Sequence, residues 1–185
     1  MRRSARSRQG LLLIPMSTLN VLFLCTHNSA RSILAEAMLN HITQGASGTH
    51  FQAFSAGSSP RENQQPNPRA LQVLQSAGIA TDDLRSKSWD EFAKPDAPHM
   101  DLVITVCDNA AGEVCPYWPG QPATAHWGYP DPSDAQGSDE ERLAAFRNTL
   151  YMIQKRLQIL VDLPADKLQK PMLQHTAREI SKGHA

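Results

Sequence analysis

The sequence predicts an α/β fold, a three-layer sandwich with a central four-stranded parallel sheet. Two observations support this prediction. Apolar runs of strand length alternate along the chain with longer segments in which apolar residues recur at helical spacing. The clearest run, residues 102–106, is a continuous β-branched segment of the kind that is buried on both faces of a parallel sheet. Strands that alternate with helices give such a sheet helices on both faces.

Each element has its own pattern and boundary signals. The first helix places apolar side chains near one face and stops at Gly45, and the second is capped by Asn67 and begins at Pro68. A capping box formed by Ser138 and Glu141 starts the longest helix, in which apolar residues recur every three or four positions. In chain order, the expected strands cover residues 21–24, 51–55, 102–106 and 123–127, and the expected helices cover residues 32–44, 68–78, 88–92 and 138–160.

We expect one domain over residues 19–163, because a chain of 185 residues suits a single hydrophobic core. Residues 1–18 are expected to form a disordered extension, since their apolar stretch is too short for the core of a signal peptide. Residues 164–185 are expected to form a C-terminal tail, in which Pro171 breaks a loose helix.

Composition excludes several classes of partner. The 18 basic and 18 acidic side chains leave a formal net charge of zero, which gives no reason to expect nucleic acid or an acidic membrane surface as a partner. No apolar stretch is long enough to cross a membrane. Three cysteines in a chain without an export signal indicate a reducing compartment, so we expect a cytoplasmic protein.

The strand-to-helix turn at residues 25–32 carries the residues best suited to chemistry. Cys25 and Arg31 stand six positions apart there, and the backbone N–H groups between them can point to one centre and form a nest. The following helix adds the positive end of its dipole, and Arg31 offers a planar fork of donors to two oxygens of a tetrahedral anion. The same field is expected to lower the pKa of the Cys25 thiol and make it a nucleophile.

We therefore expect an oxyanion-binding loop in which Cys25 is the nucleophile. Ser32 is expected to donate its hydroxyl to the sulfur, and Asn28 to brace the loop. The alternative is a buried, inert cysteine at the end of a strand. The residues assigned to the loop are Thr26, His27, Asn28, Ser29, Ala30, Arg31 and Ser32.

Cys107 and Cys115 bracket a polar segment with small residues directly after the strand at residues 102–106. Their spacing is poor for a structural zinc ion, because no Cys-x-x-Cys pair is present. Two interpretations stay open: inert thiols, or a thiol relay in which successive thiol–disulfide exchanges pass a disulfide away from Cys25.

Asp131 stands between Pro130 and Pro132, which hold the turn after the last expected strand. A rigid turn suits a general acid that protonates a leaving oxygen, although aspartate is also common in ordinary turns. Ligands bind beyond the carboxyl ends of the strands in α/β sheets, and Cys25, Cys107 and Asp131 all fall at or just after such ends.

These motifs together resemble the arsenate reductases built on the low-molecular-weight protein tyrosine phosphatase fold, of the thioredoxin-linked type. The likeness covers residues 20–161, nearly the whole chain apart from its two ends. The segments that carry the resemblance are residues 21–32, Ser55-Ala56-Gly57, residues 103–107, Cys115-Pro116, and His126-Trp127-Gly128 leading to Asp131-Pro132.

The resemblance implies that the protein reduces arsenate to arsenite, in arsenic detoxification, by a three-cysteine relay. Cys25 would attack arsenate while Asp131 assists the loss of water, and Arg31 would hold the adduct. Cys107 would then attack Cys25 and release arsenite, after which Cys115 would form a disulfide with Cys107. Thioredoxin or glutaredoxin would reduce that disulfide; the donor stays open because the segment between Cys107 and Cys115 is about one residue longer than in thioredoxin-linked relatives.

The resemblance implies no tightly bound cofactor. Some family members bind potassium near the loop, and Asn28, Glu36 and Ser55 occupy the positions where its ligands would lie. Phosphate and sulfate are expected to compete with arsenate as oxyanions, and the protein is expected to be a monomer.

Two other functions stay as alternatives. A low-molecular-weight protein tyrosine phosphatase shares the loop and the aspartate, but Ser133 replaces the tyrosine typical of that branch, and hydrolysis does not require Cys107 and Cys115. A non-enzymatic arsenite or redox sensor would bind one soft ion through three thiolates. Arg31 argues against the sensor, because a guanidinium suits an oxyanion and does nothing for a neutral soft ligand.

Overall fold

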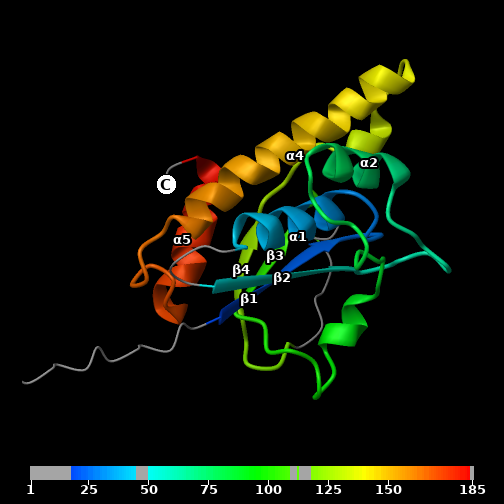
Figure 1. Cartoon of the computed structure of the whole chain (residues 1–185). Helices are drawn as coiled ribbons and strands as arrows, with labels where there is room; N and C mark the ends of the chain where they lie inside the picture. The colour runs from blue at the N-terminus through cyan, green and yellow to red at the C-terminus, as the bar shows by residue number, and fades with distance from the viewer. Residues whose placement is uncertain (1–17, 45–49, 109–111, 113–117, 184–185) are drawn as a thin grey trace, which may run out of the picture.

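A four-stranded parallel sheet forms the centre of the molecule (Figure 1). The computed structural model describes residues 18–44, 50–108, 112 and 118–183. The sheet has the order β2-β1-β3-β4, which confirms the predicted α/β fold. Its strands are β1 (Thr18–Cys25), β2 (His50–Gly57), β3 (Leu102–Thr105) and β4 (Ala123–His126).

Two hydrophobic cores lie on opposite faces of the sheet. Alternate residues of β1 point to opposite faces, so Val21 and Phe23 enter the larger core while Leu22 and Leu24 enter the smaller one. The smaller core is covered by a short 3-10 helix, η1 (Trp89–Phe92), and by Trp118. The larger core receives side chains from α1 (Arg31–Ile42), α2 (Pro68–Ser76), α4 (Asp139–Val161) and α5 (Lys170–Lys182).

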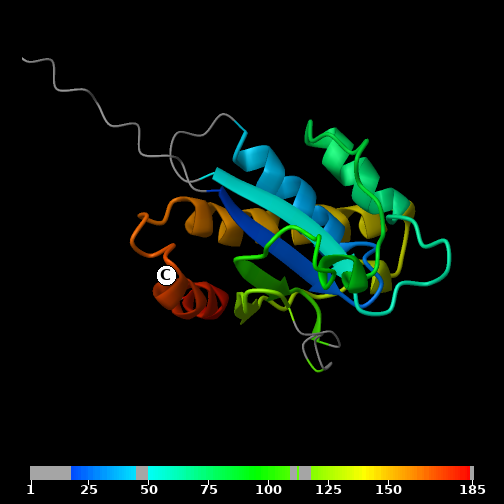
Figure 2. The same ribbon diagram turned by 90° about the horizontal axis from the view of Figure 1, so that it is seen from below.

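Helix α4 is the longest of the described elements and lies on the same side of the sheet as α1, which it contacts (Figures 1 and 2). Its predicted capping box is confirmed: the Ser138 N–H donates to Glu141 Oε2 over 2.7 Å, and the Glu141 N–H donates to Ser138 Oγ over 3.2 Å. The predicted start of α2 is confirmed too, because the Asn67 side chain accepts a bond from the Arg69 N–H and Pro68 follows it.

The expectation that Pro171 breaks a loose C-terminal helix is wrong. Helix α5 begins at Lys170, so Pro171 lies in the first turn, where a backbone N–H would have no partner within the helix. Leu173 and Ile180 pack into the larger core, and Trp127 Nε1 donates to the Ala177 carbonyl over 2.8 Å. Helix α5 is therefore packed on β4 and on the core.

Some expectations fall outside the described residues. The predicted helix stop at Gly45 and the thiol of Cys115 lie there, as does the predicted N-terminal extension except for Thr18, which begins β1. Within the part of the chain that the structure describes, no helix combines the length and the apolar character needed to cross a bilayer.

Candidate active site

The carboxyl ends of the strands bring the predicted site residues together. Cys25 ends β1 and lies beside Gly57 of β2, while Leu24 lies beside Thr105 of β3. The Val106 N–H continues this pairing by donating to the Leu24 carbonyl over 2.8 Å. Parallel pairing therefore carries the chain after β1 and the chain after β3 to one edge of the sheet.

The turn from Cys25 to α1 wraps around the sulfur. Ser32 Oγ lies 2.9 Å from Cys25 Sγ, as predicted, and the Asn28 N–H donates to the same sulfur over 3.1 Å. Asn28 has a φ of 53°, a left-handed conformation that asparagine tolerates better than most residues. This conformation turns the loop so that the Asn28 N–H points at the Cys25 sulfur.

The Asn28 side chain braces the loop, which confirms the second prediction made for this turn. Its Nδ2 donates to Ser32 Oγ over 2.9 Å and to Ser55 Oγ over 2.8 Å, and its Oδ1 accepts a bond from the Lys87 N–H over 2.9 Å. Ser86 Oγ donates to the Asn28 carbonyl over 2.6 Å. Three segments, the start of α1, β2 and residues 86–87, are thus tied to one fully buried asparagine.

Gly57 supports the loop from below, a role that the sequence analysis did not assign. A Cβ at this position would lie 2.8 Å from the Thr26 carbonyl oxygen and 3.0 Å from the Asn28 nitrogen, which is too close for carbon. The Ser58 N–H donates to the Cys25 carbonyl over 3.0 Å, just beyond this contact. The motif Ser55-Ala56-Gly57 was the available signal, because a glycine at a strand end often marks a close backbone approach.

The expectation that the loop lowers the pKa of Cys25 is wrong for this structure. Cys25 is only 5% exposed, and burial raises the pKa of its thiol above the ordinary value. The hydrogen bond with Ser32 and the N–H of Asn28 act in the opposite direction, but burial outweighs them. A pattern of donors can be recognised in the sequence, whereas the depth at which the sulfur is buried cannot.

Arg31 and Asp131 form an ion pair at the mouth of the site, 100 positions apart in sequence. Arg31 Nη2 donates to Asp131 Oδ2 over 2.6 Å, and Nη1 donates to the Tyr129 carbonyl over 3.0 Å. Asp131 caps the short 3-10 helix η2 (Pro132–Asp134) by accepting a bond from the Ser133 N–H over 3.0 Å. The predicted general acid therefore lies beside the predicted oxyanion ligand.

A cavity of about 420 Å³ opens above Cys25, between the loop, the segment before α2 and the turn after β4. Its lining residues in the described chain include no phenylalanine, tyrosine or tryptophan. Arg61 and Gln64, which the sequence analysis did not assign to the site, contribute to the rim. The lining residues are Cys25, Thr26, His27, Ser29, Ala30, Arg31, Arg61, Gln64, Asn67, Asp131, Ser133 and Asp134.

Cys107 lies at the edge of this loop. It is buried, and its Sγ lies 3.6 Å from Thr26 Oγ1. Asp108 follows it and lies 3.0 Å from the His126 ring, through Oδ1 and Nε2. Cys107, the second thiol of the predicted relay, therefore lies next to Thr26, the residue that follows Cys25.

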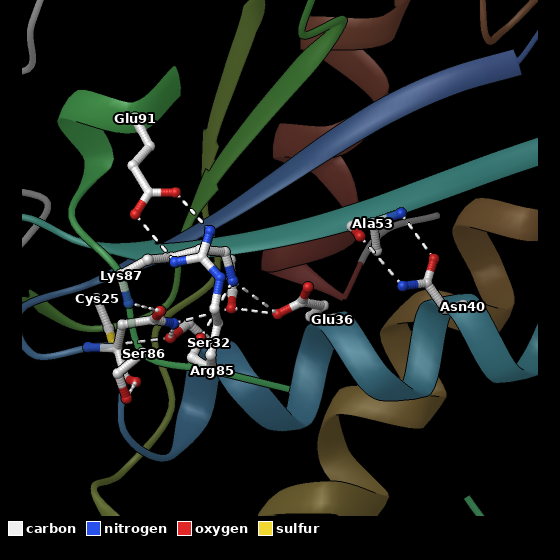
Figure 3. A network of polar contacts seen from close by, with 11 residues as sticks. Cys25, Ser32, Glu36, Asn40, Ala53, Arg85, Ser86, Lys87 and Glu91 are labelled. Carbon is white, nitrogen blue, oxygen red and sulfur yellow. Dashed lines mark hydrogen bonds and ion pairs between the residues drawn. The ribbon is translucent and has the colours of Figure 1, made fainter. Parts of the chain in front are cut away.

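The residues expected near potassium also come together, but with a lysine among them. Ser55 Oγ donates to Glu36 Oε2, and the Lys87 ammonium lies 3.5 Å from that same carboxylate oxygen (Figure 3). The donor set around Glu36 therefore already contains a cation and does not fit a potassium ion. Among the described residues, no group of three or more histidine, cysteine, aspartate or glutamate side chains is arranged to hold a metal ion.

Comparison with known proteins matches residues 20–173 to the family model described as low molecular weight phosphotyrosine protein phosphatase. The arsenate reductase of Halalkalibacterium halodurans is 35% identical over 142 residues, which cover 77% of this chain and 94% of the relative. The arsenate reductase of Bacillus licheniformis is 37% identical over 144 residues, with the same two coverages, 77% and 94%.

Solved structures of similar proteins share this fold. The arsenate reductase of Archaeoglobus fulgidus superposes with a TM-score of 0.57 at 26% identity, covering 77% of this chain and 99% of that protein. The thioredoxin-dependent arsenate reductase of Corynebacterium glutamicum superposes with a TM-score of 0.50 at 25% identity, covering 80% of this chain and 65% of that protein.

Proposed function

This chain belongs to the low molecular weight phosphotyrosine protein phosphatase family, and on that basis we propose that it is an arsenate reductase that uses three cysteines. The observation that carries the proposal is the position of Cys107, whose sulfur lies 3.6 Å from Thr26 in the loop that starts with Cys25. Hydrolysis of a phosphate ester needs one thiol, whereas reduction of a bound anion needs further thiols to supply two electrons.

In the first step, the Cys25 sulfur attacks the arsenic atom of arsenate and forms a sulfur–arsenic bond. One arsenate oxygen leaves as water, because Asp131 takes up the proton that the Cys25 thiol loses and delivers it to that oxygen. The free donors of Arg31 and the N–H groups of the loop hold the remaining oxygens. Because burial raises the pKa of Cys25, its thiol proton must be lost as the anion binds or just before attack.

In the second step, the Cys107 thiolate attacks the Cys25 sulfur. A disulfide forms between the two sulfurs, the sulfur–arsenic bond breaks, and its electron pair stays on arsenic, which leaves as arsenite. Cys115 then attacks Cys107, frees Cys25 as a thiolate, and leaves a Cys107–Cys115 disulfide. A dithiol donor of the thioredoxin or glutaredoxin type reduces that disulfide and restores the three thiols.

We also propose a thioredoxin-type electron donor and a cytoplasmic location for the reaction. One structural relative is a thioredoxin-dependent arsenate reductase, which supports a thioredoxin-type donor. A relay that ends in such a donor needs a reducing environment, so we place the reaction in the cytoplasm.

The mouth of the cavity favours a small oxyanion over an aryl phosphate. Its described lining has Arg61, Gln64 and Asp134 at the rim and, apart from the His27 imidazole, no aromatic ring: no phenylalanine, tyrosine or tryptophan of the described residues is there to stack on the ring of a phosphotyrosine. Arsenate has no ring to bury, and hydrogen-bond donors are sufficient to orient it.

One experiment separates reductase, phosphatase and sensor. The reduced protein is mixed with arsenate, NADPH and either the thioredoxin or the glutaredoxin system, and NADPH oxidation is followed at the same time as aryl-phosphate hydrolysis in a parallel assay. We expect arsenate-dependent NADPH oxidation by the parent. In Cys107→Ser that oxidation should stop while any weak aryl-phosphate hydrolysis survives, because Cys25 and its loop are intact.

Cys115→Ser serves as the matched variant for the last exchange. It should complete a single turnover, release one equivalent of arsenite and retain a Cys25–Cys107 disulfide that mass spectrometry of non-reduced peptides detects. Fast aryl-phosphate hydrolysis without arsenate turnover would establish the phosphatase instead. Tight arsenite binding with neither activity would establish the sensor.

A further inference from the structure

A buried ion pair lies directly beneath the oxyanion loop (Figure 3). Lys87 is 8% exposed and Glu36 is 9% exposed, and the Lys87 Nζ lies 3.5 Å from Glu36 Oε2. Burying either charge alone would cost several kcal/mol, so each group depends on the other. The Lys87 Nζ also donates to the Arg85 carbonyl over 3.2 Å, which satisfies a second of its three donors.

This pair is connected to the reactive sulfur through Asn28. Ser55 Oγ donates to the Glu36 carboxylate and accepts the bond from Asn28 Nδ2, while the Lys87 N–H donates to Asn28 Oδ1. Asn28 in turn presents its own N–H to Cys25 Sγ. Both parts of Lys87 therefore hold Asn28. The backbone N–H binds it directly, and the ammonium acts on it through Glu36 and Ser55.

The side-chain oxygens of Asn28, Ser55 and Glu36 are the atoms that a monovalent metal ion would need as ligands here. An alkali cation binds oxygen atoms with free lone pairs, but the Asn28 Oδ1 is turned toward the Lys87 N–H, and Ser55 Oγ is engaged with both Asn28 and Glu36. One carboxylate is balanced by one ammonium here. A metal ion added beside them would leave an uncompensated positive charge in a buried place.

The outer side of the pair is closed by a second ion pair. Arg85 binds the Glu91 carboxylate through two bonds, Nη1 to Oε1 over 2.9 Å and Nη2 to Oε2 over 2.5 Å (Figure 3). Both side chains are far more exposed than that of Lys87, so this second ion pair lies at the surface.

We propose that the Lys87 ammonium takes the place of a structural monovalent metal ion beneath the loop, so that this protein holds its oxyanion loop without potassium. Lys87 is a positioning residue in this proposal: it fixes Glu36, Ser55 and Asn28, and it does not touch the oxyanion. The proposal does not depend on which reaction the loop catalyses.

Two measurements without arsenate or an electron donor test it. The first is thermal unfolding in potassium chloride and in choline chloride at equal concentration. We expect the parent to unfold at the same temperature in both salts, because Lys87 already fills the site. Lys87→Ser, which opens the space and adds an oxygen, should unfold at a lower temperature in choline chloride and recover part of the loss only in potassium chloride.

The second measurement is the affinity for inorganic phosphate by calorimetry. Lys87→Met keeps the length of the side chain but removes the charge, and we expect it to bind phosphate roughly tenfold more weakly than the parent in choline chloride. Lys94→Met, an exposed lysine a few residues away, is the control and should bind like the parent.

Three results would overturn the proposal. One is a saturable, potassium-specific stabilisation of the parent, a result that does not require any variant to fold. Another is a Lys87→Ser variant that is destabilised equally in the two salts. The last is a Lys87→Met variant that matches the parent in both unfolding temperature and phosphate affinity.

Discussion

Arg31 Nη2 lies 2.6 Å from Asp131 Oδ2 and joins the loop after β1 to the turn after β4. The pair is partly shielded, with the Arg31 side chain 16% exposed and the Asp131 side chain 32% exposed. The guanidinium uses two of its five donors on Asp131 and the Tyr129 carbonyl, so others are available for an oxyanion. Arg31, which would bind the anion, thus also holds Asp131, whose carboxyl group would protonate the leaving oxygen.

Replacing Asp131 by asparagine should separate binding from chemistry. We expect kcat for arsenate reduction to fall by about 10²- to 10⁴-fold, because the proton donor is lost, while phosphate binds at least as tightly since a nearby negative charge has been removed. Asp134→Asn, which lines the same cavity, should change kcat little. Steady-state kinetics and phosphate calorimetry measure the two effects, and an unchanged kcat in Asp131→Asn would exclude the general acid.

The pH dependence of Cys25 alkylation should reflect its burial. Because burial raises the pKa of this thiol, the thiolate forms at a higher pH than in an exposed cysteine, and the alkylation rate should rise only in the alkaline range. The hydrogen bond with Ser32 is the largest effect that lowers the pKa, so Ser32→Ala should shift the profile to still higher pH. Peptide mapping after iodoacetamide treatment isolates Cys25. A shift to lower pH would contradict the structure, and Ser29→Ala is the control.

Adding one methyl group at Gly57 should disturb the loop more than it disturbs the fold. The new Cβ would press on the Thr26 carbonyl and the Asn28 nitrogen, which are backbone atoms and cannot turn away as a side chain can. We expect Gly57→Ala to lose at least roughly tenfold in phosphate affinity.

The control for this substitution is Gly78→Ala. Gly78 has a φ of 74° and nothing within 4 Å of its added Cβ, so alanine should cost about 1–2 kcal/mol of stability through backbone strain and leave phosphate affinity unchanged. Calorimetry and urea unfolding on both variants distinguish the two effects. Equal phosphate affinities in the two variants would show that the contact beneath the loop is unimportant.

The sequence predicts the strands and the loop well because their signals are local. A β-branched run, a capping box and a cysteine and arginine at a strand-to-helix turn each lie within a few residues, and the structure confirms β3, the start of α4 and the contacts of Ser32. The position of Asp131 beside the loop was also predicted, since the turn after a parallel strand must lie at the site edge of the sheet.

Features that depend on three-dimensional packing were missed or reversed. The pKa of Cys25 depends on burial, which no spacing of donors reveals. Lys87 lies 59 positions from Asn28, and a lysine in a polar segment gives no sign that the chain will bury it against Glu36. A proline can begin a helix or break one. Here Pro171 lies in the first turn of α5, which packs on β4.

Helix α5 should contribute to global stability if it belongs to the core. Leu173 is 2% exposed, whereas its neighbour Met172 is 37% exposed, so the two positions make a matched pair on one helix. Leu173→Ala should lower the free energy of unfolding by about 2–5 kcal/mol, and Met172→Ala should change it by less than about 0.5 kcal/mol. Urea unfolding monitored by far-ultraviolet circular dichroism measures both free energies. Equal, small losses in both variants would mean that α5 unfolds separately from the sheet.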